Sequence, residues 1–188
     1  MNLVNVNTSS RPELSAKSPD TSTDIAYSIG DNALGKILVA RSAVGVCAIL
    51  IGSDDDELTN DLAACFPMSR LIPNEPRLRD DLDRVARFVE RPDAGLDLPL
   101  DMRRGTPFQR RVWDALRAIP CGTMVTYAAL ARRIGEPKAA RAVATTCAAN
   151  AIALGIPCHR VVRSNGTLSG YRWGIERKRA LIDKEARP

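Results

Sequence analysis

The residues best suited to covalent chemistry are a cysteine and a histidine that stand next to each other, Cys158 and His159. A thiolate is a strong nucleophile, but a free cysteine with a pKa of about 8.5 is mostly protonated at neutral pH. A neighbouring imidazole can take the thiol proton, directly or through one water molecule. His159 is the only histidine of the 188 residues. The dipeptide therefore predicts a nucleophile beside its base.

The backbone around the pair decides how the two side chains meet. Adjacent side chains of a strand point to opposite faces, so a direct Cys158–His159 bond is not assured, and a bridging water or a local turn would be needed. Pro157 fixes its own φ and favours extended geometry at Ile156. The alternative interpretation is that Cys158 is a small buried hydrophobic residue, the commoner role of a free cysteine, and His159 an ordinary hydrogen-bonded histidine.

Such a site also needs a carboxylate to orient the imidazole ring. Glu185 is the most attractive candidate because it closes a helix-like segment, residues 175–186, that can fold back onto the site. The basic half of the chain offers a small set of carboxylates, namely Asp101, Asp114, Glu136, Glu176, Asp183 and Glu185.

The charge of the chain is unevenly divided. Residues 1–100 contain 10 basic and 16 acidic side chains, a net charge of −6, whereas residues 101–188 contain 17 and 6, a net charge of +11. The basic half indicates a polyanionic partner. Five scattered cysteines argue against a disulfide framework and favour a cytosolic setting, and the lack of a Cys-x-x-Cys pair argues against structural zinc. No apolar segment approaches the roughly 18 residues of a membrane span, and no secretory signal is visible.

The N-terminal half predicts a small unit of strands and helices. Residues 1–24, with little apolar content, are predicted to be a flexible tail. Strands are expected over 26–29, 35–40 and 45–51 as an antiparallel meander, with a turn at 30–32. Helices are expected over 54–66 and 80–90, where apolar residues recur three and four positions apart.

The C-terminal half predicts three consecutive helices, over residues 108–119, 127–134 and 138–149. Thr106-Pro107 is a suitable start for the first. The other two are joined by a short turn with Gly135, which is typical of a helix-turn-helix. The last helix is built mainly of Ala and Thr, with Arg141 as its one long side chain. It is either a tightly packed core helix or one that approaches a nucleic-acid groove closely, and the basic charge favours DNA.

These features occur together in one protein family. The segment Pro157-Cys158-His159-Arg160-Val161-Val162 resembles the active-site signature of the O6-alkylguanine-DNA alkyltransferases. The resemblance covers about residues 25–187, and its N-terminal part and the last of its motifs are especially similar to the C-terminal methyltransferase portion of bacterial adaptive-response proteins. The other motifs of the family occur along this chain in the same order as in the family. They are the residues 104–113, 119–122, Tyr127, 138–143, Asn150 and 166–174.

The resemblance implies a role for each matching residue. Cys158 would take the alkyl group by in-line displacement, His159 would polarise the thiol through water, and Glu185 would orient the histidine. Asn150 would tie the recognition helix to the active-site turn. Tyr127 would crowd the 3′ phosphate, promote rotation of the nucleotide and donate a proton or hydrogen bond to the guanine ring.

The remaining implied roles concern DNA and the flipped base. Arg141 would fill the vacated base stack, and the small residues Ala139 and Ala140 would lie at the minor groove. A base must leave the duplex to reach a protein pocket, at a cost of a few kcal/mol. Backbone groups of Cys158, Val161 and Arg172 would bind the guanine, and the substrate-binding residues are therefore predicted to include Val161, Tyr171 and Arg172.

One position departs from the family pattern. Residue 172 is Arg where some members carry a small polar residue, which should narrow the pocket mouth or add a phosphate contact, and bulky alkyl groups are then disfavoured. Trp113 is expected in the core, whereas Trp173 either forms a wall of the pocket or packs under the loop. Inert core or near-surface thiols are expected at the other four cysteines, Cys47, Cys65, Cys121 and Cys147, of which Cys147 could also lie near the pocket.

The resemblance thus implies an α+β fold of two domains. Residues 25–100 would form a ribonuclease-H-like sheet with helices, and residues 101–188 a helical domain with a winged helix-turn-helix. The implied function is stoichiometric repair of O6-methylguanine, and less well O4-methylthymine, in double-stranded DNA. A monomer would act without cofactor or metal in the bacterial cytoplasm, at the nucleoid. The alternatives are a non-catalytic alkyltransferase-like lesion-binding protein, which would lack the cysteine, and a plain helix-turn-helix regulator.

Overall fold

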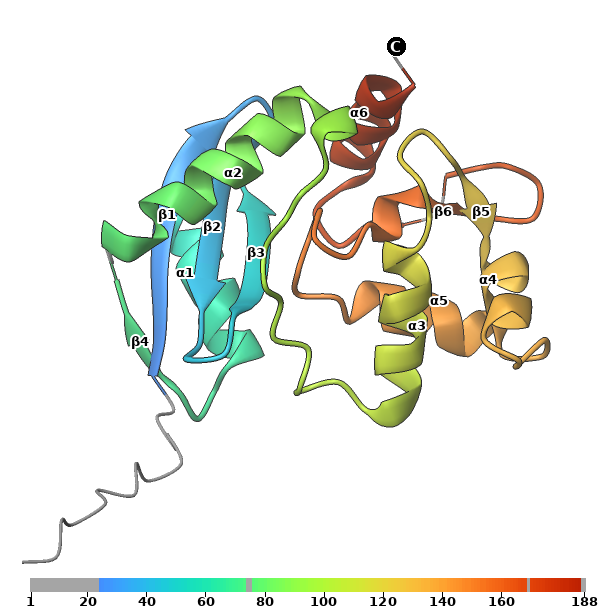
Figure 1. Cartoon of the computed structure of the whole chain (residues 1–188), viewed down its shortest axis with the longest axis horizontal. Coiled ribbons are helices and arrows are strands. Elements are labelled where there is room, and N and C mark those ends of the chain that lie inside the picture. Colours follow the sequence, from blue (N-terminus) through green and yellow to red (C-terminus); the bar gives the residue numbers. More distant parts are fainter. Residues whose placement is uncertain (1–23, 74–75, 169, 187–188) are drawn as a thin grey trace, which may run out of the picture.

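The computed structural model describes residues 24–73, 76–168 and 170–186. The chain has a mixed α/β fold, with a sheet and two helices in the N-terminal half and a group of helices in the C-terminal half (Figure 1). The strands are β1 Asp24–Asn32, β2 Gly35–Arg41, β3 Val46–Gly52, β4 Arg70–Ile72, β5 Val125–Thr126 and β6 Val161–Val162. The α-helices are α1 Asp55–Cys65, α2 Arg79–Glu90, α3 Pro107–Arg117, α4 Tyr127–Arg133, α5 Ala140–Ala148 and α6 Ile175–Glu185.

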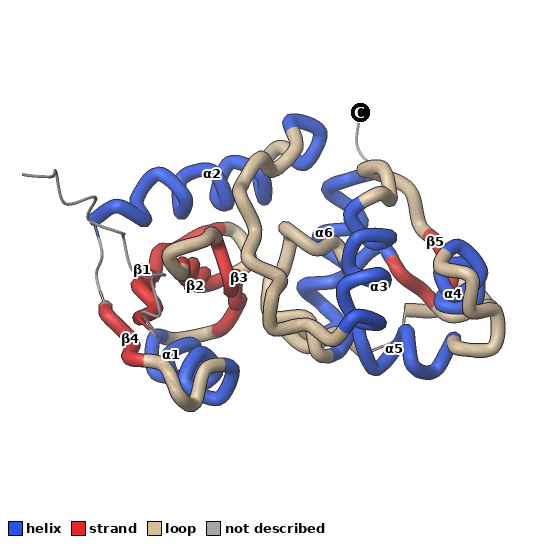
Figure 2. The backbone as a smooth tube through the Cα atoms, turned by 60° about the horizontal axis from the view of Figure 1, so that its bottom comes forward, coloured by secondary structure: helices blue, strands red, loops and turns tan. Residues whose placement is uncertain are grey.

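The N-terminal sheet has the strand order β3-β2-β1-β4. Strands β1, β2 and β3 pair in antiparallel fashion, which confirms the predicted meander. Helices α1 and α2 cover opposite faces of this sheet (Figure 2). Every residue of β3 is buried as a result. A strand covered on both faces must be apolar throughout, which explains the uninterrupted hydrophobic sequence of this segment.

The first hairpin differs from the prediction. Strand β1 continues to Asn32, so the turn lies at residues 33–34 rather than at 30–32. The side chain of Asn32 accepts a hydrogen bond from Leu34 N at 2.7 Å, and Gly35 adopts a φ of +112° that favours glycine. The predicted tail of residues 1–24 lies outside the described residues except for Asp24, which is the first residue of β1 and not part of a tail.

Strand β4 was not predicted because three residues carry no detectable alternation. It pairs in parallel with the start of β1, where Arg70 and Asp24 form an ion pair that reinforces the register. The helices follow the predictions more closely. Helix α3 begins with a complete capping box between Thr106 and Gln109. Helix α5 begins at Ala140 rather than residue 138, because residues 136–139 form the connecting turn.

The free edge of β3 joins the two halves of the chain. Ile49 N donates to Ala151 O and Ile49 O accepts from Ala153 N, both at 2.9 Å. Near the start of the same strand, Val46 exchanges backbone hydrogen bonds with Pro99 and Asp101. The buried apolar residues form one cluster that runs from the sheet into the helices. The segment that leads to Cys158 is therefore fastened to the sheet. Within the described part of the chain, no helix has the length and apolarity that a bilayer crossing requires.

A substitution at Gly105 tests the packing between α3 and the segment that precedes it. A Cβ atom at this position would lie 2.3 Å from Cζ3 of the buried Trp113. We expect Gly105→Ala to lower the free energy of unfolding by about 1–3 kcal/mol, the usual cost of overpacking. Urea unfolding measures the change. Gly170→Ala, where a Cβ meets no atom within 4 Å, is the control; equal stability of the two variants would contradict this packing.

Candidate active site

Cys158 lies in a single 3₁₀ turn, Cys158–Arg160, between α5 and β6. Its side chain points inward and the residue is only 4% exposed. Pro157 precedes the turn, and Cys158 N donates to Ile156 O at 2.7 Å. The backbone thus turns at the cysteine instead of continuing as a strand, so the opposite-face rule for strands does not apply to the Cys158–His159 pair.

The buried amide of Asn150 holds this turn. Its Nδ2 lies 3.3 Å from Cys158 Sγ and 2.9 Å from Ile156 O, and its Oδ1 accepts from Ile152 N at 2.8 Å. Asn150 has no exposed surface and follows Ala149, the C-cap residue of α5. The structure therefore brings the end of α5, the turn and the thiol together through one side chain.

His159 and Glu185 also meet. His159 Nε2 lies 2.8 Å from Glu185 Oε1, and both side chains are buried. Burial lowers the pKa of His159, so the ring is neutral at pH 7. The ionised carboxylate requires the proton on Nε2, which leaves Nδ1 as an acceptor. Nδ1 is buried and has no hydrogen-bond partner among the described residues.

Arg160 completes this cluster and was not singled out from the sequence. Its guanidinium donates to both oxygens of Glu185 at 2.8–3.1 Å and to Ile119 O at 2.5 Å. Burial alone would raise the pKa of Glu185, but the hydrogen bonds from His159 and Arg160 lower it to about 2. The carboxylate is therefore charged at neutral pH. Of the carboxylates considered, Glu185 is the one that reaches the histidine.

Lys178 on α6 is a second residue that sequence reasoning missed. It is 1% exposed, and its Nζ donates to Val161 O at 2.6 Å. Burial lowers its pKa, while the nearby thiols of Cys158 and Cys147 act in the opposite direction. The spacing of Lys178, Leu181 and Glu185 places all three on one helix face. That spacing is the signal that would have identified it.

The thiol of Cys158 is protonated in the resting protein. Burial raises its pKa, and the hydrogen bond from Asn150 and the charge of Lys178 lower it by smaller amounts. Reaction at neutral pH therefore needs a base that removes the thiol proton. Nδ1 of His159, next in the chain, is the acceptor that this cluster offers.

The residues predicted to bind the substrate lie close by. Val161 is fully buried, and Tyr171 packs edge-to-face on Trp173 with ring centroids 5.0 Å apart. The Tyr171 hydroxyl is buried without a hydrogen-bond partner among the described residues. The guanidinium of Arg172 lies 3.4 Å from Cys65 Sγ and 3.5 Å from Asp61 Oδ2 on α1. The guanidinium of Arg172 therefore has partners on α1, and the predicted phosphate contact stays a prediction.

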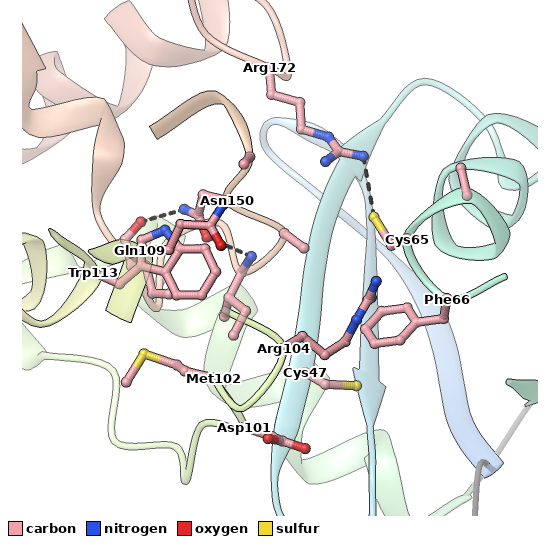
Figure 3. Close-up of a pocket in the computed structure, with 15 residues that line it drawn as sticks. Cys47, Cys65, Phe66, Asp101, Met102, Arg104, Gln109, Trp113, Asn150 and Arg172 are labelled. Carbon is pink, nitrogen blue, oxygen red and sulfur yellow. Dashed lines mark hydrogen bonds between the residues drawn. The ribbon is translucent and has the colours of Figure 1, made fainter. Parts of the chain in front are cut away.

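A cavity of about 380 Å³ lies between the sheet half and the helical half (Figure 3). Asn150 and Ile156 line it from the helical half, and Cys65 of α1 and Phe66, which caps that helix, line it from the sheet half. Arg172 reaches across its edge toward Cys65 (Figure 3). The cavity thus adjoins the amide that contacts Cys158.

The two predicted DNA-reading helices stand next to this site. Strand β5 pairs in parallel with β6, so that Val125 faces Val161, and α4 starts with Tyr127 directly after β5. Arg141 is exposed on α5, while Ala139 and Ala140 are half-buried. Only Val143, Thr146 and Cys147 of the nine residues of α5 are buried, which argues against the core-helix alternative. Trp113 is in the core, as predicted.

The chain is similar to known proteins over most of its length. The family model described as 6-O-methylguanine DNA methyltransferase, DNA binding domain, matches residues 107–187. The bifunctional transcriptional activator/DNA repair enzyme Ada of Escherichia coli is 51% identical over 162 residues, which are 86% of this chain and 46% of that protein. A methylated-DNA–protein-cysteine methyltransferase of Candida albicans is 33% identical over 87% of this chain and 97% of its own length.

Solved structures agree with these matches. The crystal structure of the Mycobacterium tuberculosis methyltransferase in complex with DNA is 34% identical, covers 86% of this chain and 92% of its own, and superposes with a TM-score of 0.70. The chain therefore belongs to the methylated-DNA–protein-cysteine methyltransferase family. It spans about half the length of the Ada proteins that it matches.

The buried contacts of Glu185 with His159 and Arg160 predict how the stability of the protein depends on pH. Glu185→Gln removes the ionised partner of a buried arginine, so we expect the free energy of unfolding at pH 7 to fall by about 3 kcal/mol. Because the pKa of Glu185 is lowered from 4.5 to about 2, this stabilisation is present above about pH 4.5 and is lost as the pH falls toward 2.

Urea unfolding of both proteins between pH 7 and 3 measures the difference. Glu176→Gln, an exposed position on the same helix, is the control. A stability difference that stays constant down to pH 3 would show that the carboxylate is not held charged by its partners.

Proposed function

We propose that this protein repairs DNA by transferring the alkyl group from O6 of guanine to Sγ of Cys158. The sulfur attacks the alkyl carbon in line, the carbon–oxygen bond breaks, and a thioether forms. The thiol proton ends on the released guanine, so no oxidant or cofactor is consumed. The observation that carries the proposal is a buried thiol held by Asn150 beside a buried His159–Glu185 pair.

The proton route follows from the charges of the site. Nδ1 of the neutral His159 accepts the thiol proton through a bridging water, and the carboxylate of Glu185 stabilises the imidazolium that forms. The charge of Lys178 favours the thiolate. Tyr127 stabilises the departing base by donating a proton or hydrogen bond. A thioether has no good leaving group, so each chain acts once.

DNA binding rests on the helical half. Helix α5 presents Arg141 together with the small residues Ala139 and Ala140. Small side chains fit the narrow minor groove, where the hydrogen-bonding groups of the bases distinguish few sequences. Arg141 fills the space of the flipped nucleotide, while other basic side chains of this half contact phosphates. Double-stranded DNA with O6-alkylguanine is the proposed substrate, and O4-methylthymine a poorer one. The pocket is formed with Val161, Tyr171 and Arg172.

The organisation of the chain is part of the proposal. Residues 25–100 act as a ribonuclease-H-like structural domain, and residues 101–188 as a winged helix-turn-helix domain with the acceptor cysteine. The proposed protein is a monomer that works in the bacterial cytoplasm at the nucleoid.

Label transfer tests the reaction directly. Wild-type protein incubated with duplex DNA that carries a radiolabelled methyl group on O6 of guanine should gain at most one label per chain. We expect Cys158→Ala to abolish transfer and to retain DNA binding in a mobility-shift assay, because the thiol is the acceptor. Cys121→Ala, at an exposed cysteine, is the control.

Transfer that survives in Cys158→Ala, or several labels per chain, would overturn the proposal. Tight binding of the lesion by the wild type without transfer would instead favour the non-catalytic lesion-binding alternative.

A substitution at Arg141 distinguishes the base-flipping step from the alkyl-transfer step. We expect Arg141→Ala to slow repair of O6-methylguanine in duplex DNA at least about tenfold, because unstacking a base costs a few kcal/mol. Reaction with free O6-benzylguanine, which needs no flipping, should change little. Single-turnover kinetics measure both rates, and Arg91→Ala, an exposed arginine in the sheet half, controls for the lost charge. Equal losses on both substrates would argue against the role of Arg141.

A further inference from the structure

The segment of residues 171–174, which carries Tyr171, is attached to the sheet half by two arginines. The first is Arg172, whose Nη2 lies 3.4 Å from Cys65 Sγ and 3.5 Å from Asp61 Oδ2. Both partners belong to α1, more than a hundred positions earlier in the chain. Figure 3 shows this guanidinium spanning from its loop to Cys65 at the edge of the cavity.

The second is Arg177, in the first turn of α6. Its Nη1 donates to Trp173 O at 3.0 Å, its Nε donates to Leu34 O at 2.9 Å, and its Nη2 lies 3.4 Å from Ser53 Oγ. Leu34 lies in the turn between β1 and β2, and Ser53 directly follows β3. One guanidinium thus connects the backbone of Trp173 with two points of the sheet.

The segment held in this way lies near the reacting thiol. The Tyr171 hydroxyl and Trp173 Nε1 are both buried without hydrogen-bond partners among the described residues. The thiol of Cys158 contributes to raising the pKa of Tyr171, second to burial, which is consistent with their proximity. Arg172 lines the same cavity as Asn150, the residue that contacts Cys158 Sγ.

We propose that Arg172 and Arg177 are positioning residues through which the sheet half sets the width of the substrate pocket and so limits the size of the alkyl group that Cys158 accepts. This inference rests on the proposed function. An anchored loop keeps its backbone groups aligned on a small substrate, and small misplacements slow transfer strongly. Release of an anchor lets the loop move outward, which costs alignment for a methyl group but gives room to a larger one.

The two anchors should differ in strength. The Arg172–Asp61 pair is long, and its side chains are 25% and 43% exposed, so the pair is weak. Arg177 is half-buried and has three partners, two of them backbone carbonyls. Loss of Arg177 should therefore have the larger effect.

The experiment compares Arg177→Gln, Arg172→Gln and Asp61→Asn with Arg179→Gln, an exposed arginine on the same helix, as the control. Hydrogen exchange of the peptide over residues 163–174 reports on the anchors without any substrate. Transfer rates are measured with O6-methylguanine in duplex DNA and with free O6-benzylguanine. We expect faster exchange in this peptide and a rise of at least about threefold in the benzyl-to-methyl rate ratio for Arg177→Gln, with smaller rises for the other two.

Unchanged exchange in the peptide, or a rate ratio equal to that of Arg179→Gln, would overturn the positioning role. If Arg177→Gln loses its folded structure, Asp61→Asn, at a half-buried residue that contacts only the first anchor, decides the question. Absence of transfer in the wild type overturns the proposed function, whereas transfer with an unaltered ratio overturns only the role of the two arginines.

Discussion

One buried amide, the side chain of Asn150, connects the parts of this protein that must act together. It follows the C-cap of α5, holds the backbone of the active-site turn at Ile156 and contacts Sγ of Cys158. The next residues, Ala151 and Ala153, pair with the edge of β3. Each buried polar group left without a partner costs about 1–3 kcal/mol, so an Asn at this position leaves the turn few other conformations. The helix that is proposed to read DNA and the thiol that is proposed to react are thereby fixed relative to each other.

The charges around the thiol follow a second constraint, the exclusion of water. The side chains of Glu185, Arg160 and His159 are all buried. They hydrogen-bond to one another and to the carbonyl of Ile119, while Nδ1 of His159 has no partner among the described residues. Compared with apolar residues of the same size, a buried ion pair of this kind contributes little net stability, because desolvation offsets its attraction. Removal of one partner alone is costly, because it leaves the other charge buried and unpaired. Its physical effect is to hold the carboxylate charged and the imidazole in one orientation. Lys178 adds a positive charge near the sulfur while its ammonium remains bonded to Val161 O.

Several features were accessible from the sequence because they depend on neighbouring residues. The amphipathic spacing of α1 to α3 and the cap at Thr106 are local signals, as is the adjacency of Cys158 and His159. Strand β4 escaped detection because three residues that acquire order by pairing with β1 have no pattern of their own. The hairpin turn was predicted in the wrong place because Gly30 is a residue type that is common in turns. In the structure, β1 continues past Gly30 and stays paired with β2 as far as Asn32. The ribonuclease-H-like and two-domain descriptions remain proposals.

By itself the sequence determined the order of the main helices and the three long strands, the basic character of the C-terminal half and the candidate nucleophile. Each of these features follows from the composition of the chain or from the spacing of residues that are close in sequence. The tertiary structure alone decided which carboxylate meets His159, that Arg160 and Lys178 share the site, and that Arg172 reaches α1. These contacts join residues from 17 to 107 positions apart, and helix periodicity can place Lys178 and Glu185 on one face without showing what that face contacts. They exist because folding removes water from all of these groups at once, and each polar group must then find its partner inside the protein.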